Sequence, residues 1–111
     1  MKRRTIEVIS SREPKPSAPY EAAILAAELG ADVPTIDLHG DSFEDAKYRV
    51  GNFLYQNHPE GTEVLRIIHG KGTQVLHDKL HAWLKKQQGV IHVRNAEATG
   101  QQGGVTYVVI G

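Results

Sequence analysis

"VLRIIHGKGTQVL", residues 64–76, decides the fold of this 111-residue chain. Its first half, Val64–Ile68, is too apolar for a half-exposed edge and predicts a central strand in a sheet covered by helices. Its second half opens a helix in which apolar residues from Leu76 to Leu84 recur at spacings of three and four. Between the halves lies the turn His69–Thr73, with two glycines, one lysine and one imidazole. The stretch therefore predicts a strand–turn–helix unit of an α/β sheet.

An earlier stretch repeats this arrangement. A brief strand is predicted over Thr35–His39, and Gly40 ends it. A helix then begins at Asp41 or Ser42, either of which can cap its first turn, and its apolar residues again share one face. We expect each strand–helix–strand unit to be a right-handed crossover onto a parallel neighbour.

The rest of the chain completes a small domain. We expect a flexible, basic, proline-rich arm over residues 1–18, a short helix and linker over 19–34, and the main domain over 35–111. Two further strands are predicted over 90–96 and 105–111, and the last is expected to be antiparallel to its neighbour. The fold class is thus an α/β (α+β) two-layer sandwich of order βαβαββ with a mixed four-stranded sheet, preceded by a short N-terminal helix.

The composition excludes several classes of protein. The chain has no cysteine, so it offers no disulfide, no thiolate nucleophile and no cysteine-based zinc site. No apolar run approaches the roughly 20 residues that span a bilayer, and the first residues lack the apolar stretch of a signal peptide. These features predict a cytoplasmic protein without a membrane partner.

The formal net charge of zero conceals an uneven distribution. Residues 20–63 carry nine acidic side chains against two basic ones, whereas residues 64–94 carry six basic side chains against one acidic one. The second half of the domain is therefore suited to face a polyanion. A solvated helix face, paired with the acidic half, explains the charges equally well.

The two strand-to-helix turns are expected to form one site. Both lie at the carboxyl ends of predicted parallel strands, where open α/β sheets usually bind ligands. His39 and His69 should therefore approach each other. The period of two along a strand places Asp37 on the face of His39, so we expect this carboxylate to orient the imidazole.

The second turn has the properties of a phosphate site. Gly70 and Gly72 allow close approach of the backbone, the following helix begins with unpaired N–H groups, and Lys71 adds a full charge. The spacing of the glycines excludes a nucleotide-binding P-loop, which needs four residues between its first glycine and the Gly-Lys pair.

Metal binding has weaker support. His77 and His81 lie four residues apart on a predicted helix, but no third ligand is evident, and a solvated helix face is favoured. The sequence requires no cofactor. Mg²⁺ or Mn²⁺ could bind through Asp37, although one carboxylate is a poor site.

Three ordered motifs, IDLHG (36–40), IIHGKGT (67–73) and GGVTYVVI (103–110), together resemble the small MutS-related family, called Smr, over about Thr35 to Ile110. The resemblance implies a compact βαβαββ sandwich similar to the C-terminal domain of bacterial translation initiation factor 3. It also implies structure-selective binding and nicking of DNA in repair or recombination, or cleavage of RNA, including messenger RNA on collided ribosomes. Nucleic acid and the ribosome are therefore the expected partners.

The residue types in these motifs suggest a mechanism of phosphodiester cleavage. We expect Asp37 to orient His39, which acts as general base or acid, and His69 to take the complementary role or hydrogen-bond the scissile phosphate. Lys71 and the glycine backbone would stabilise the charge that develops. The predicted phosphate and nucleic-acid contacts are Gly40, Gly70, Lys71, Gly72, Thr73, Lys79, Lys85, Lys86, Arg94, Gly103 and Gly104.

Two other functions stay open at this point. The same turn can grip a phosphate without cutting it, which would make the chain a non-catalytic nucleic-acid-binding module. A small-molecule phosphate enzyme, or a domain that binds only proteins, is the third alternative.

Overall fold

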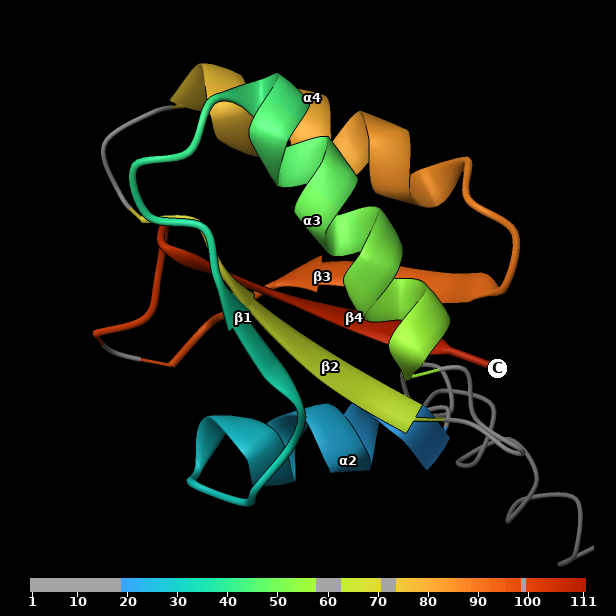
Figure 1. Cartoon of the computed structure of the whole chain (residues 1–111). Coiled ribbons are helices and arrows are strands. Elements are labelled where there is room, and N and C mark those ends of the chain that lie inside the picture. Colours follow the sequence, from blue (N-terminus) through green and yellow to red (C-terminus); the bar gives the residue numbers. More distant parts are fainter. Residues whose placement is uncertain (1–18, 58–62, 71–73, 99) are drawn as a thin grey trace, which may run out of the picture.

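A computed structural model of the chain describes residues 19–57, 63–70, 74–98 and 100–111 (Figure 1). The described helices and strands are, in chain order, α2 (Pro19–Glu28), β1 (Thr35–Asp37), α3 (Phe43–Gln56), β2 (Glu63–Ile68), α4 (Gln74–Lys85), β3 (Val90–Asn95) and β4 (Val105–Ile110). The order after α2 is βαβαββ, as the sequence predicts. The expected arm over residues 1–18 lies outside the described residues. Within the described part of the chain, no helix has the length and apolar character needed to cross a membrane.

The four strands form one mixed sheet in the order β1-β2-β4-β3. β1 is parallel to β2, with Asp37 opposite Ile68, and β4 is antiparallel to both of its neighbours. The parallel first unit and the antiparallel last strand are therefore confirmed. The expectation that β3 would be a parallel neighbour of β2 is wrong, because β4 lies between them.

One face of the sheet is covered by α3 and α4 (Figure 1). Leu65 and Ile67 of β2 point to this face, where they pack with Val50 of α3 and Leu80 of α4, all with no exposed surface. Fully burying side chains of this size stabilises the fold by about 1.5–3 kcal/mol each. The helix α3 begins after Ser42, whose hydroxyl accepts a hydrogen bond from the backbone N–H of Asp45 at 3.1 Å.

The opposite face of the sheet is covered by α2. Ile24 and Ala27 of α2 pack against Val64 of β2 and Tyr107 of β4. The strand β2 is thus covered by helices on both faces and lies between two other strands, which confirms its predicted central position. The short N-terminal helix adds a third layer to the predicted two-layer sandwich.

Candidate nucleic-acid site at the strand ends

The turn after β1 is held by hydrogen bonds within the turn and by Arg49 of the helix α3. The Asp37 carboxylate accepts a hydrogen bond from the backbone N–H of His39 at 2.9 Å, and the N–H of Asp41 donates to the carbonyl of Leu38 at 2.8 Å. Arg49 of α3 donates to the carbonyl of Asp37 at 3.2 Å and to the carboxylate of Asp41 at 2.7 Å. The Asp37 carboxylate therefore fixes the backbone of His39. The sequence predicted a bond to the imidazole instead, and it gave no signal for Arg49.

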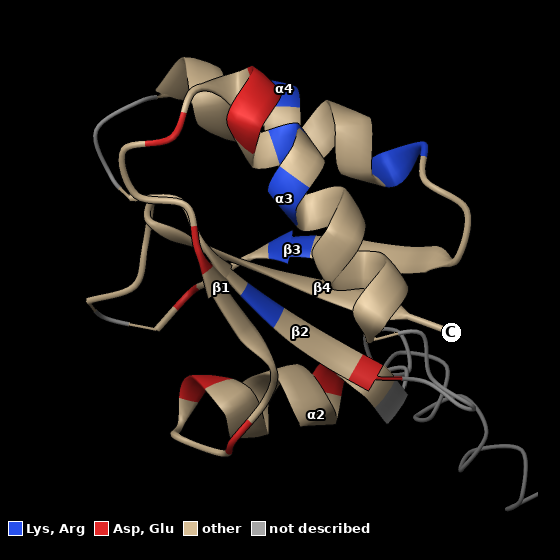
Figure 2. Cartoon of the chain, viewed as in Figure 1, with Lys and Arg blue, Asp and Glu red and all other residues tan. Residues whose placement is uncertain are grey.

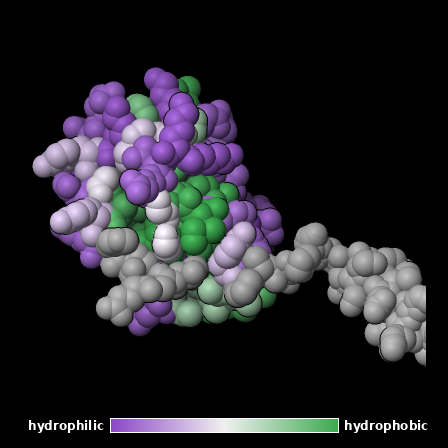
Figure 3. Space-filling view, turned by 90° about the vertical axis from the view of Figure 1, so that its right-hand side faces the viewer, coloured by the Kyte–Doolittle hydropathy of each residue, from purple (hydrophilic) through white to green (hydrophobic). Residues whose placement is uncertain are grey.

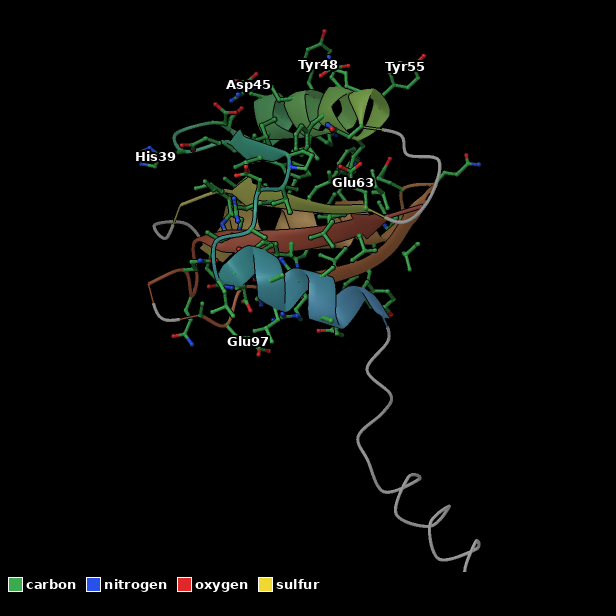
Figure 4. The ribbon with its side chains drawn as sticks, turned by 90° about the horizontal axis from the view of Figure 1, so that it is seen from below. His39, Asp45, Tyr48, Tyr55, Glu63 and Glu97 are labelled. Carbon is green, nitrogen blue, oxygen red and sulfur yellow. The ribbon has the colours of Figure 1, made fainter. Side chains whose placement is uncertain are left out.

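His39 and Gly70 bring the two motifs together. A Cβ added at Gly70 would lie 3.1 Å from Cδ2 of His39, so the imidazole rests directly on the glycine. Gly70 has a φ of +86°, which glycine adopts without strain. His39 itself is exposed and points away from the body of the domain (Figure 4). The predicted approach of the two turns is thus present, with His39 on its solvent side.

His69 occupies a different environment from His39. It is 3% exposed, and both of its ring nitrogens have partners: Nδ1 lies 3.1 Å from the carbonyl oxygen of Gly70, and Nε2 lies 2.9 Å from Oγ1 of Thr106. Burial lowers the pKa of His69 and is only partly offset by the bond to Gly70. In this conformation the ring does not reach the surface. This burial does not favour the direct phosphate contact expected from the sequence, which stays a prediction.

Gly104 of the third motif holds the turn after β2 through its backbone carbonyl. The carbonyl of Gly104 accepts hydrogen bonds from the backbone N–H groups of His69 at 2.9 Å and Gly70 at 3.1 Å. Gly103 and Gly104 lie in the turn that leads into β4. The N–H of Gly70 is therefore already bonded within the fold, and the predicted phosphate contact of this glycine stays a prediction.

The remaining predicted phosphate contacts have different outcomes. Lys71, Gly72 and Thr73 lie outside the residues that the structure describes. Three exposed cations lie on or just after α4, namely Lys79, Lys85 and Lys86. Figure 2 shows basic residues along α4 and α3, whereas α2 on the other face carries only acidic ones.

Arg94 does not belong to the exposed basic surface. Its side chain is 16% exposed and forms ion pairs with Glu21 at 3.2 Å, Glu28 at 3.4 Å and Glu97 at 3.5 Å. These ion pairs do not favour the predicted contact of Arg94 with nucleic acid, which stays a prediction. The sequence shows the charge of Arg94 but not the carboxylates of α2 that the fold brings to it.

His77 and His81 do not form the solvated face that the sequence favours. The imidazoles of the two residues stack with centroids 4.2 Å apart, and the His77 ring lies edge-on to His69 at 5.3 Å. The Nε2 of His81 lies 2.8 Å from the same Thr106 hydroxyl that His69 contacts. Burial and the neighbouring imidazoles lower the pKa of His81 to about 4, so this ring is neutral at pH 7.

The opposite end of the sheet carries a pocket of about 570 Å³, lined by Leu54, Tyr55 and Ile110 among others. Figure 3, which faces that side of the domain, shows an apolar area bordered by hydrophilic side chains. Ile110 pairs with Glu63 at the start of β2, whereas His69 follows the end of this strand. The pocket is therefore separate from the turn site.

Comparisons with known proteins agree with this geometry. The model of the Smr domain family matches residues 36–111. "Endonuclease MutS2" of Listeria welshimeri is 32% identical over 97 residues, covering 85% of this chain, and that of Geobacillus kaustophilus is 33% identical over 108 residues, covering 95%. The matched region makes up 12% and 13% of these relatives, so the chain is related to one part of much larger proteins.

A solved structure supports the same assignment. The crystal structure of the Smr domain of Thermus thermophilus MutS2 superposes with a TM-score of 0.66 at 29% sequence identity, and it covers 71% of this chain and 99% of the solved one. Fold, motif geometry and sequence similarity thus agree, and the chain belongs to the Smr domain family.

Proposed function

We propose that this chain binds structured DNA or RNA and nicks a phosphodiester bond at the paired turns, by which we mean the turn after β1 with His39 and the turn after β2 with Gly70. The observation that carries the proposal is the exposed imidazole of His39, which rests on Gly70 where two family motifs meet. The relatives named endonuclease support it, although they match this chain over only a small part of their length. This substrate class includes DNA in repair or recombination and messenger RNA on stalled ribosomes.

His39 is the proposed catalytic residue. Its imidazole takes the proton of the attacking water, or of the internal 2′-hydroxyl when the substrate is RNA, as the new bond to phosphorus forms. A general base of this kind contributes about 10²- to 10⁴-fold in rate. His69 is enclosed, so the leaving oxygen takes its proton from solvent as its bond to phosphorus breaks.

Asp37 and His69 are proposed as positioning residues. The Asp37 carboxylate holds the backbone amide of His39, and Arg49 ties the same turn to α3. His69 donates its Nδ1–H to the Gly70 carbonyl and thereby fixes the glycine on which the His39 ring rests. Both contacts limit how far the catalytic imidazole can move relative to a bound phosphate.

The exposed cations supply affinity in this proposal. Lys71 belongs in sequence to the turn His69–Thr73 and is proposed to neutralise the scissile phosphate. Lys79, Lys85 and Lys86 are exposed and are proposed to contact flanking phosphates without reading the sequence. Binding should therefore weaken steeply as salt is added.

A second candidate function is binding without cleavage. The observation that favours it is the Asp37 carboxylate, which bonds the backbone of His39 and leaves the imidazole without a carboxylate to orient it. General bases are commonly oriented by a second group, so an unsupported ring is a weaker catalyst.

One assay separates the two candidates. The purified chain is incubated with supercoiled plasmid, with branched DNA and with long structured RNA, each with and without Mg²⁺ or Mn²⁺. We expect nicking of at least one substrate, loss of nicking in His39→Ala, and full nicking in His92→Ala, whose histidine lies on β3 beside Glu21. Binding without any cleavage across the metal and pH series would support the second candidate.

A further inference from the structure

Three imidazoles, one from the turn after β2 and two from α4, come together where α4 packs on the sheet. His69 follows β2, and His77 and His81 lie one turn apart on α4. Each offers one ring nitrogen, and these three nitrogens all lie within 4.8 Å of one another. His69 is buried and the other two are half-buried, so the cluster is enclosed within the fold.

The hydrogen bonds of His69 determine which nitrogen is available. The Gly70 carbonyl can only accept, so Nδ1 of His69 carries the proton and Nε2 presents its lone pair. This lone pair accepts the single proton of the Thr106 hydroxyl, and His81 must then donate its own Nε2–H to the same oxygen. Two imidazoles thus share one hydroxyl, which a cation between them could replace.

The cluster also has outer contacts typical of metal-binding histidines. Ligating histidines generally donate their second N–H to a carboxylate or a backbone carbonyl. The Nδ1 of His69 donates to the Gly70 carbonyl, and the Nδ1 of His77 lies 2.9 Å from the Asp78 carboxylate. The Nε2 of His69 contacts the Thr106 hydroxyl, and the Nε2 of His77 lies 2.6 Å from Oδ1 of Asn95, so a metal bound at these nitrogens would replace both contacts.

We propose that His69, His77 and His81 form a binding site for one Zn²⁺ ion, distinct from the paired turns at His39. Imidazole nitrogen suits zinc, whereas Mg²⁺ and Mn²⁺ prefer oxygen ligands. Nitrogens bound at about 2.0–2.1 Å in a tetrahedral site lie roughly 3.3 Å apart, so small side-chain rotations close the site from its present spacing. The described residues contribute three ligands to the cluster, and water completes the fourth position.

The position of this site gives it a consequence for the fold. A zinc ion would link α4 directly to the end of β2, one residue before Gly70. The two segments are otherwise joined here by hydrogen bonds through Thr106 of β4. Metal binding would therefore stabilise the arrangement of the helix against the turn on which His39 rests.

The test uses the full chain without a histidine tag, stripped of metal with a chelator and returned to chelator-free buffer. Calorimetric titration with Zn²⁺ should show one ion per chain with a dissociation constant of about 1 µM or lower. Substitution with Co²⁺ should give the visible absorption of a tetrahedral cobalt site. Circular dichroism of each variant establishes that it is folded.

The variants distinguish zinc bound by the three histidines from zinc bound nonspecifically at the protein surface. His77→Gln and His81→Ala should each weaken Zn²⁺ binding by at least 100-fold, and Asp78→Ala by about 10- to 100-fold through loss of the outer contact. The matched controls, His39→Ala and His92→Ala, should bind zinc as the parent chain does. Absence of one-to-one binding in the parent chain would overturn the site. So would equal affinity in His77→Gln, which keeps a helix-forming residue at a position only 15% exposed.

Discussion

His39 and His69 each precede a glycine just beyond one of two parallel strands, but His69 directly follows β2, whereas His39 is the second residue after β1. The His39 ring is exposed and lies on Gly70, whereas His69 is buried with both ring nitrogens bonded. Two causes account for the difference. Leu38 and His69 each directly follow a strand and are both buried, so His39 lies one residue further out. In addition, β1 is an edge strand, while β2 lies between β1 and β4. The same local pattern therefore gives a residue suited to chemistry at the edge and a structural residue at the centre.

The largest expected effect on stability is at the buried member of this pair. Replacing His69 with alanine leaves the Gly70 carbonyl without its donor and opens a cavity, so His69→Ala should lower the free energy of unfolding by about 3 kcal/mol. His39→Ala, at an exposed position, should change it by less than about 0.5 kcal/mol. Urea unfolding in buffer containing a chelator measures both without a metal contribution. Equal losses in the two variants would contradict the assigned environments.

The glycines that follow the two histidines, Gly40 and Gly70, extend the comparison of the two turns. Gly40 and Gly70 have φ angles of +88° and +86°, so alanine at either position should cost about 1–2 kcal/mol in stability. An added Cβ meets nothing within 4 Å at Gly40, but at Gly70 it meets the His39 ring at 3.1 Å. Gly70→Ala alone should therefore reduce nicking, by about tenfold or more, because it displaces the imidazole. The nicking rate of each folded variant is the measurement, and equal rates would show that this contact has no role.

A smaller effect is expected at a carboxylate far from the turns. Burial raises the pKa of Glu28. Hydrogen bonds from the backbone N–H groups of Glu97 and Ala98, together with the charge of Arg94, lower the pKa by more than burial raises it. The pKa of Glu28 therefore lies below its ordinary value of 4.5. This stabilisation is complete above about pH 4.5 and is lost as the pH falls through the folded-state pKa.

Glu28→Gln should therefore reduce stability by about 1 kcal/mol at pH 7, and the difference from the parent chain should shrink as the pH drops below 4.5. Unfolding free energies measured between pH 3 and pH 7 follow this difference. Nicking by the folded variant at pH 7 should be unchanged. A stability difference that grows toward low pH would reverse the inferred sign.

The sequence predicted the first strand–helix–strand unit because its signals are local. Apolar periodicity, a capping Ser42 and the glycine ends of the strands all belong to single elements. The order of the last strands was less accessible, because the apolar pattern of β3 does not say whether β2 or β4 pairs with it. The ion pairs of Arg94 were missed for the same reason, since its partners Glu21 and Glu28 lie more than 60 residues away in the sequence.

Within the site, the sequence identified His39 and the two glycine turns but not their bonding. The period of two places Asp37 and His39 on one face only while the strand continues, and β1 ends at Asp37. His39 then lies in a turn, where its backbone reaches the carboxylate. The helical spacing of His77 and His81 showed that they share a face, but only the packing of α4 on the sheet brings His69 to them.

The central claim is that an exposed His39 performs chemistry at a site whose affinity comes from other residues. The most direct measurement compares the parent chain and His39→Ala on one labelled substrate, recording both the dissociation constant and the single-turnover nicking rate. We predict that the nicking rate falls by about 10²- to 10⁴-fold while the dissociation constant changes by less than about threefold. Nicking by His39→Ala at the parental rate would contradict the account.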